Sequence, residues 1–374
     1  MKMLDYVKLA NVRMSENLDR AQLLTSPLVD EFRRAAKAAL VLVSSGSSRN
    51  ASEAVRHFME KTLGIAVRVV TPEAFAAYEA MAARDAFVVA ITQSGYSTNT
   101  IAALDALRER GMRAIALTAN VQAPVKDHAD AVIDYGVGVE SVDFVTMGVQ
   151  ALMEFLALFS LHAAHVCAHI CNQELEAGMQ GVRDAVAAHA QALALSESFV
   201  ERERLHLARS APTIFVGNGP NQGVIAEAAL KFMETLKRPA MTFECEEFIH
   251  GPEMQMTPEH ALFLVDDARG SARMAQLAAA FASVFPATRF ITAHPTKASF
   301  ELCVPEVSDP LLSAIPNLVP FQYIAAAMSE ELDCWDVHPY LKRIDDALDA
   351  KAAGYDDALE ALRRQASACY GEGK

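Results

Sequence analysis

Two short segments of the sequence combine hydroxyl side chains with residues that favour tight turns. Residues 44–50 read SSGSSRN and follow the apolar run 40–43, and residues 92–100 read TQSGYSTNT and follow the apolar run 86–91. Backbone N–H groups at the start of a helix, together with small hydroxyl side chains, are suited to holding an anion such as phosphate. Both segments are therefore candidate phosphate-binding turns.

Each turn alone has a simpler interpretation, which is an ordinary strand-to-helix connection with serine as the helix cap. The two turns together favour the phosphate site, because both follow strands in the same half of the chain. Ligands of open α/β sheets bind at the carboxyl ends of strands. Neither turn contains GxGxxG or GxxxxGK[ST], so the fingerprints of nucleotide-binding loops are absent.

Ten short runs of β-favouring residues must position these turns, and helical stretches separate most of them. The runs are 40–43, 66–70, 86–91, 114–118 and 131–133 in the first half and 213–216, 240–243, 261–265, 289–292 and 300–304 in the second. Strands that alternate with helices predict an α/β fold, in which a mainly parallel sheet is covered by helices on both faces.

The two halves of the chain also resemble each other. Residues 41–75 and 214–248 both read as an apolar strand, a turn rich in Gly, Ser or Asn, an amphipathic helix and a second strand. The tripeptide Phe-Met-Glu occurs in both helices, at 58–60 and at 232–234. Chance similarity of two βαβ units is the alternative, and the shared tripeptide makes a duplication the better interpretation.

The composition is that of a globular protein. The chain has 374 residues, of which 52% are hydrophobic and 21% charged, with a net charge of -14. This length suits two or three domains and a large apolar core, and the composition excludes a disordered or collagen-like chain. The acidic excess offers the phosphate backbone of a nucleic acid little attraction, so we expect no nucleic-acid partner.

The cysteines and the apolar segments indicate the compartment. The six cysteines are dispersed without a CxxC pair, and the first twenty residues contain no apolar signal core. The longest apolar stretch, residues 147–166, is interrupted by Gln150, Glu154, Ser160, His162 and His165. We expect a buried helix there rather than a membrane span, and a cytoplasmic protein that binds no membrane.

The two turns resemble those of the sugar isomerase (SIS) domain family, which typically read GTS and then a run such as SQSGET. The second half resembles the isomerase part of glucosamine-6-phosphate synthase, because GNGPNQGVIAEAALKFMETL matches a glycine turn followed by ExALKxxE. Residues 247–252, EFIHGP, match the family pattern ExxHGP. The resemblance covers roughly residues 30–345 and implies two tandem SIS domains of flavodoxin-like, three-layer architecture.

This resemblance predicts four parts of the chain. They are a first SIS domain at 30–165 with the phosphate-binding turns, a helical linker at 166–205, a second SIS domain at 206–345 with the catalytic residues, and a C-terminal helical tail at 346–374. Residues 345–374 alternate Ala and Leu with charged residues, so we expect one terminal helix that carries no motif.

The resemblance assigns roles by position. Glu234 resembles the glutamate that moves a proton between C1 and C2 of the sugar, and Glu227 and Lys231 can share its helix face. His250 resembles the histidine that opens the ring or protonates the leaving group, and in these relatives it often comes from the other subunit of a dimer. The residues that resemble phosphate ligands are Ser47, Ser48, Thr92, Gln93, Ser94 and Ser97.

The residue types suit these roles. A carboxylate can take a proton from one carbon and return it to the next on the same face of the substrate. A histidine changes protonation near neutral pH, so it can serve a ring oxygen or a departing amine. Lys231 could stabilise an enediolate or enaminol oxygen, or hold Glu234 ionised. The simpler alternatives are an exposed helix face with i,i+4 pairs, and a turn-packing role for His250.

The sequence departs from the family pattern in two places. Tyr96 stands where the family commonly has an acidic residue. Residues 336–343 replace the PRNLAK and SVTVE segment of the synthase, which leaves Lys342 as a stand-in for its C-terminal lysine. The sequence also contains no glutaminase domain, so we do not expect glutamine-dependent synthesis of glucosamine 6-phosphate.

The form EFIHGPE resembles the deglycase branch of the family. It implies a fructosamine-6-phosphate deglycase that releases glucose 6-phosphate and an amine or amino acid. The resemblance implies a homodimer or higher homo-oligomer with sites near the subunit interface. No metal or organic cofactor is expected, because the carbonyl of the substrate is the electron sink.

Two alternatives remain open at this point. One is an isomerase or deaminase that acts on glucosamine 6-phosphate. The other is a phosphosugar-binding regulatory protein without catalysis. Such regulators usually carry a helix-turn-helix domain, for which the roughly 30 residues before the first strand are too short.

His162, His165 and His169 form a separate candidate metal site, because their spacing places them on one helix face. No acidic or CxxC partner is near them in the sequence. Histidines satisfied inside a packed helix are the simpler interpretation, so we predict no metal site.

Overall fold

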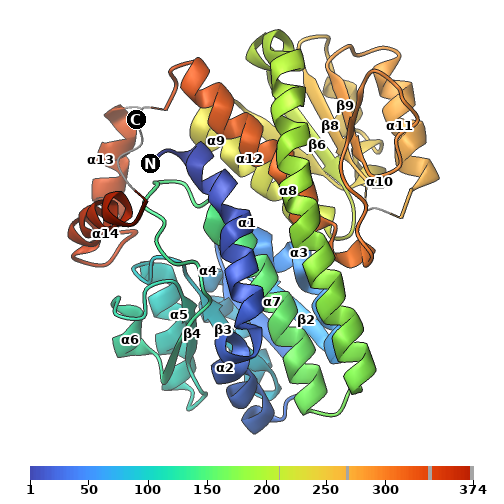
Figure 1. The fold of residues 1–374 in the computed structure, drawn as a ribbon. Coiled ribbons are helices and arrows are strands. Elements are labelled where there is room, and N and C mark those ends of the chain that lie inside the picture. The colour runs from blue at the N-terminus through green and yellow to red at the C-terminus, as the bar shows by residue number, and fades with distance from the viewer. Residues whose placement is uncertain (210, 267–268, 336–338, 371–374) are drawn as a thin grey trace. The chain divides into compact units, whose positions relative to one another are not determined.

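The protein folds into two compact units in the computed structural model, which describes residues 1–209, 211–266, 269–335 and 339–370 (Figure 1). Unit 1 contains residues 1–52, 56–179 and 336–374, and unit 2 contains residues 53–55 and 180–335. Each unit is built on one five-stranded sheet, and every strand pairing in both sheets is parallel. The predicted α/β class is confirmed.

The strands of unit 1 are ordered β2-β1-β3-β4-β5. This is the flavodoxin-like order, in which the chain reverses its direction of travel across the sheet between β1 and β3. In sheets of this order ligands commonly bind at the carboxyl ends of those two strands, so this edge is the expected position of the site. The bounds are β1 Ala39–Ser44, β2 Ala66–Val70, β3 Phe87–Ile91, β4 Ile115–Thr118 and β5 Ala131–Asp134, each within one residue of the prediction.

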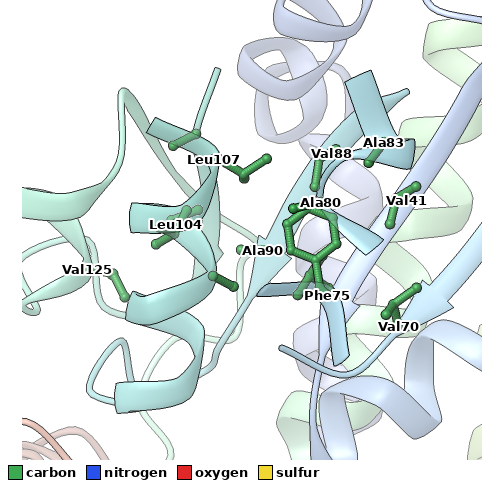
Figure 2. Packing of buried hydrophobic residues seen from close by; sticks show 14 of the residues in the cluster. Val41, Val70, Phe75, Ala80, Ala83, Val88, Ala90, Leu104, Leu107 and Val125 are labelled. Atoms are coloured by element: carbon green, nitrogen blue, oxygen red, sulfur yellow. The ribbon is translucent and has the colours of Figure 1, made fainter. Parts of the chain in front are cut away.

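Successive residues of these strands alternate between two buried layers. Val41 and Val88 pack with Leu104 in the apolar core that Figure 2 shows. On the other face, Phe87 meets Phe32 edge to face, with ring centroids 5.3 Å apart. The longer helices of unit 1 are α1 Met3–Asp19, α2 Ala21–Ala35, α3 Gly46–Leu63, α5 Thr98–Glu109 and α7 Met147–Val166, and the short ones are α4 Pro72–Ala74 and α6 Val125–His128.

Unit 2 repeats this arrangement, with strands ordered β10-β9-β8-β6-β7. If the strands of each unit are numbered 1 to 5 along the chain, both sheets have the order 2-1-3-4-5. The predicted duplication is therefore confirmed at the level of topology. The bounds are β6 Thr213–Gly217, β7 Ala240–Phe243, β8 Ala261–Val265, β9 Thr288–Thr292 and β10 Glu301–Cys303.

Aromatic rings dominate one face of the second sheet. Phe215 and Phe263 stack with centroids 5.4 Å apart, and Phe232 and Phe321 meet Phe215 edge to face. These rings join the sheet to α9 and α12, and α10 and α11 pack on the other face. The helices of unit 2 are α9 Asn221–Leu236, α10 Cys245–Phe248, α11 Ala272–Ala282 and α12 Ala314–Glu331.

The boundary between the compact units falls within α8 Asn172–Arg209, a single helix of 38 residues. This helix includes most of the segment that the sequence predicts to be a helical linker. The compact units group residues that contact one another, and this grouping does not test where the domains begin and end. The predicted domain limits at 165, 205 and 345 therefore stay predictions.

Within the described ranges, two helical segments are long and apolar enough to span a membrane by length and composition, α7 and Pro310–Glu331. Their apolar windows are 94% and 89% buried. The prediction of a buried helix at 147–166 is therefore confirmed. The polarity argument for it was wrong, because Gln150, Glu154 and Ser160 do not lower the hydropathy enough and are themselves buried.

The C-terminal stretch forms two helices rather than the predicted single one. α13 Pro339–Leu348 and α14 Tyr355–Tyr370 are separated by residues 349–354. Asp349 and Gly354 have φ values of 45° and 84°, which no right-handed helix accommodates. Between them, Lys351 forms an antiparallel bridge with Ser97, so the tertiary contact replaces a helical turn.

The turn after β3 depends on a glycine. Gly95 has φ +75°, and a Cβ built on it would lie 2.4 Å from the Cβ of Ala123. The carbonyl of Gly95 accepts a hydrogen bond from Val125 N at 3.2 Å. Both the left-handed conformation and the close approach exclude a larger residue here.

We predict that Gly95→Ala lowers the free energy of unfolding by about 2–5 kcal/mol. The cost of a left-handed backbone conformation in alanine and the cost of the clash with Ala123 both contribute to this loss. Urea unfolding followed by circular dichroism measures the change. Gly64→Ala is the matched control, because Gly64 has φ +68° with nothing within 4 Å of a built Cβ. The control is expected to lose about 1 kcal/mol. Equal losses in the two variants would contradict the packing argument.

Candidate functional site

The two hydroxyl-rich turns converge at the switch point of the first sheet. Ser44 at the end of β1 is in register with Ile91 at the end of β3. One turn leads into α3 and the other into α5, so the N-termini of two helices point toward this edge. Asn99 Nδ2 donates a hydrogen bond to Ser45 Oγ at 3.3 Å, which joins the turns directly.

The predicted phosphate ligands differ in their accessibility. Ser48, Ser94 and Ser97 are partly exposed, whereas Ser47 and Thr92 are buried. Thr92 Oγ1 donates to Ser97 Oγ at 3.2 Å, so the buried hydroxyl orients the exposed one. The accessible hydroxyls and the backbone of the turns are therefore the groups that an anion can reach.

Gln93 is held inside unit 1. Its Nε2 donates to Glu140 Oε2 at 2.8 Å, and its Oε1 accepts from the Tyr135 hydroxyl at 3.0 Å. Its backbone carbonyl accepts from Thr118 Oγ1 at 3.1 Å. These bonds orient the backbone of the turn, and direct binding of phosphate by the Gln93 side chain stays a prediction.

Glu140 supports this turn and was missed by the sequence analysis. Its carboxylate accepts hydrogen bonds from the backbone N–H groups of Thr146, Met147 and Gly148 at 2.7–2.9 Å, at the start of α7. Burial raises the pKa of Glu140, and its hydrogen bonds with Gln93 and the backbone oppose that rise. Glu140 lies between β5 and α7 in a segment without strand or helix periodicity, so no local signal indicated it.

In unit 2, the predicted acidic and basic residues of α9 form one ionic cluster. Lys231 Nζ lies 3.4 Å from Glu227 Oε1 and 2.5 Å from Glu234 Oε2. The side chains of Lys231 and Glu227 are 0% and 1% exposed, while that of Glu234 is 28% exposed. The alternative of an exposed helix face is therefore wrong, and Glu234 is the member of the cluster that reaches the surface.

Burial and the neighbouring charges set the protonation of this cluster. Burial alone lowers the pKa of Lys231, but the carboxylates of Glu227 and Glu234 outweigh it and raise that pKa above its ordinary value. Burial raises the pKa of Glu234, and Lys231 opposes this effect without cancelling it. Two carboxylates share one ammonium, so Glu234 retains affinity for a proton. A carboxyl group in this state is suited to general base and acid chemistry.

The duplication offers an internal comparison for Glu234. The equivalent residue of the first copy, Glu60, accepts from Arg56 Nη1 at 3.2 Å and from Val67 N at 3.3 Å. Glu60 thus joins its helix to the following strand, β2. Glu234 contacts the buried Lys231, and the equivalent of Lys231 in the first copy, His57, has its Nδ1 3.4 Å from Glu60 Oε2.

His250 lies on the surface of unit 2, after α10. Its Nδ1 lies 2.6 Å from the carbonyl oxygen of Glu246. A carbonyl oxygen only accepts hydrogen bonds, so Nδ1 carries the hydrogen and Nε2 is the nitrogen left for a substrate. Within the described residues His250 forms no hydrogen bond with Glu234, so the structure does not join these two predicted catalytic groups.

The remaining candidates have structural partners or lie outside the description. His162 Nδ1 lies 2.7 Å from Thr25 Oγ1, and His165 Nδ1 lies 3.3 Å from the Ile170 carbonyl oxygen. The described part of the chain contains no group of three or more His, Cys, Asp or Glu residues placed to hold a metal. The Lys342 side chain lies outside the described residues.

Residues 34–161 match the model of the SIS domain family. Residues 34–161 thus form an SIS domain, and the sheet of unit 2 repeats its strand order. It is 26% identical over 214 residues to glutamine–fructose-6-phosphate aminotransferase (isomerizing) of Zymomonas mobilis. That match covers 57% of this chain and 35% of the relative, so the chain spans only part of the curated proteins it resembles.

Solved structures share the fold of the whole chain. A protein from Clostridium difficile 630, provisionally assigned as a phosphosugar isomerase, superposes with a TM-score of 0.84 and 21% identity over 92% of this chain and 98% of its own. Tagatose-6-phosphate ketose/aldose isomerase of Escherichia coli superposes with a TM-score of 0.70 and 16% identity over 90% of this chain and 96% of its own. The predicted tandem SIS fold is therefore confirmed.

The ionic cluster gives a prediction about stability. Lys231→Met leaves the buried Glu227 carboxylate without its countercharge, so we expect the free energy of unfolding at pH 7 to fall by about 3–5 kcal/mol. Chemical denaturation measures it. Arg273→Met is the control, because its pair with Glu246 at 2.7 Å is 45% and 47% exposed and contributes little in water. A loss for Lys231→Met no larger than that for the control would contradict the assigned countercharge role.

Proposed function

We propose that this protein is a cytoplasmic SIS-family enzyme that acts on a 6-phosphorylated amino sugar. Its most specific form is a fructosamine-6-phosphate deglycase. The observation that carries the proposal is the Glu227–Lys231–Glu234 cluster, in which a partly exposed carboxylate with raised pKa is held by a buried ammonium. Such a group can take up and return a proton, which favours catalysis over binding alone.

Phosphate binding is assigned to the turns at the β1–β3 edge. Ser48, Ser94 and Ser97 supply accessible hydroxyls there, and the first N–H groups of α3 and α5 supply donors that a helix leaves without internal partners. Several matched relatives are named for hexose 6-phosphates, among them fructose 6-phosphate and tagatose 6-phosphate. The donors of the turns and the names of these relatives both support a 6-phosphosugar as the ligand.

Glu234 is assigned as the base that moves the proton. In a ketoamine it removes a proton from C1, and the resulting enaminol takes a proton back at C2 to give the aldimine. Water then adds to C1, and the C1–N bond breaks to release glucose 6-phosphate and the amine. The reaction is a net hydrolysis with no change of oxidation state overall. Its proton transfers need a group whose pKa lies near the working pH.

Lys231 is assigned to hold the Glu234 carboxylate rather than to touch the substrate, because its side chain has no exposed surface. His250 is assigned as the acid that protonates the leaving amine through Nε2, since Nδ1 is occupied by the Glu246 carbonyl. The exposed position of His250 suits a residue that serves another copy of the chain. We therefore include a homodimer or higher homo-oligomer in the proposal.

The test is an assay of the purified protein with fructose-amino-acid 6-phosphates, followed by measurement of glucose 6-phosphate. We expect Glu234→Gln to lower kcat by about a hundredfold to ten-thousandfold, since an amide cannot accept the proton. Glu60→Gln is the matched control from the first copy and is expected to keep near wild-type activity. Full activity of Glu234→Gln would overturn the assigned base.

The pH profile gives a second readout of the same assay. Because Glu234 must be ionised to act as base, kcat/KM should rise with pH through its raised pKa, above the ordinary range of glutamate. Ammonia release from glucosamine 6-phosphate, without turnover of fructosamine phosphates, would replace the deglycase by a deaminase. Tight binding of sugar phosphates with no turnover of either substrate would favour the regulatory protein.

A further inference from the structure

The segment between α13 and α14 is joined to the second hydroxyl turn by backbone hydrogen bonds. Ala352 N donates to the Tyr96 carbonyl at 2.8 Å, and Thr98 N donates to the Ala350 carbonyl at 3.3 Å. Both partners belong to unit 1. The C-terminal segment thus pairs with the second hydroxyl turn through an isolated antiparallel bridge between Lys351 and Ser97.

Aromatic packing holds this segment in place. The rings of Tyr96 and Tyr355 meet edge to face with centroids 5.7 Å apart, and Lys351 Nζ lies 4.9 Å from the centroid of Tyr355. Tyr96 stands where the family commonly has an acidic residue. Its contact with Tyr355 gives a physical reason for that departure, because an exposed carboxylate could not pack in this way.

The ammonium group of Lys351 lies beside Ser97, a predicted phosphate ligand. Lys351 Nζ donates to Ser97 Oγ at 3.4 Å, and Thr92 Oγ1 donates to the same oxygen. Because the Ser97 oxygen accepts both bonds, its own hydroxyl hydrogen is left to donate. A phosphate oxygen at this point would therefore meet two adjacent donors, one of them charged.

Lys351 has no acidic partner in the part of the chain that the structure describes. Among the described residues, its ammonium group forms no ion pair, and its partners are Ser97 and the Tyr355 ring. Lys351 as a whole residue is exposed. Neighbouring atoms nevertheless displace water from its ammonium group, and this desolvation lowers the pKa of Lys351. An anion that binds beside it would favour the charged form of the ammonium and gain a charge-assisted hydrogen bond.

We infer that Lys351 binds the phosphate group of the substrate and supplies a positive charge beside the second hydroxyl turn, residues 92–100. This inference rests on the proposed function, because it adds a ligand to the same phosphate site. The charge matters because residues 92–100 offer only neutral hydroxyl, amide and backbone donors, whereas a phosphate monoester carries up to two negative charges. The C-terminal segment is then part of the binding site rather than a tail without a motif.

The test is a calorimetric titration of the full chain with fructose 6-phosphate, and with fructose for comparison. We expect Lys351→Met to weaken binding of fructose 6-phosphate by about tenfold to a hundredfold, as for the loss of one charge-assisted hydrogen bond. Lys351→Arg should recover most of the affinity. The wild-type affinity should also fall more steeply with salt than that of Lys351→Met.

Two control variants separate this inference from the proposed function. Lys8→Met removes an exposed lysine of α1 and should bind like the wild type. Ser97→Ala removes a hydroxyl of the turn itself. If Ser97→Ala weakens binding and Lys351→Met does not, the phosphate site stands and the role of Lys351 is overturned. If the wild type binds no fructose 6-phosphate, the proposed function is overturned and this inference with it.

A labelling experiment covers the case in which Lys351→Met disturbs the fold. The wild-type chain is treated with acetic anhydride with and without inorganic phosphate, and acetylated lysines are located by mass spectrometry. Phosphate should protect Lys351 and leave Lys8 unchanged. Equal labelling of Lys351 in both conditions would contradict the inference.

Discussion

The pairing of β1 with β3 is the constraint on which the candidate phosphate site depends. Parallel strands end at the same edge of a sheet, and the reversal of connection direction between these two strands leaves that edge open. The register of Ser44 with Ile91 therefore brings together two turns that are separated by over 40 residues in the chain. The helix N-termini and the serine hydroxyls of the two turns meet because of that adjacency, whereas the pairing of Lys351 with Ser97 also needs the C-terminal segment to pack against the second turn.

Buried charges take different roles in the two units. In unit 1, Glu140 accepts hydrogen bonds from backbone N–H groups at the start of α7 and from the Gln93 side chain, so this buried carboxylate supports the backbone of a turn. In unit 2, Lys231 is buried between two carboxylates, and only Glu234 reaches the surface. A buried charge is costly without partners, and in both units hydrogen bonds or opposite charges offset that cost. Glu60, the equivalent of Glu234 in the first copy, joins its helix to β2.

Much of this organisation could be predicted from local patterns. Each strand is a short β-favouring run between turn residues, so all ten lie close to their predicted bounds. The cluster on α9 follows from helical spacing, because residues three and four apart lie on one face. The spacing did not indicate that this face is buried, since burial depends on the packing of α12 against α9. Thr235 Oγ1, for example, contacts the Ala325 carbonyl at 3.4 Å.

The sequence by itself determined the α/β class, the duplication, the strands and the two hydroxyl turns, because each of these rests on residues that are near one another in the chain. Only the tertiary structure decided that Glu140 holds Gln93, that Glu234 is the accessible member of its cluster, and that Lys351 meets Ser97. Lys351 and Ser97 are 254 residues apart. Contacts at such separations leave no periodicity in either segment, and they exist only once the sheet has formed and the C-terminal chain has packed against it.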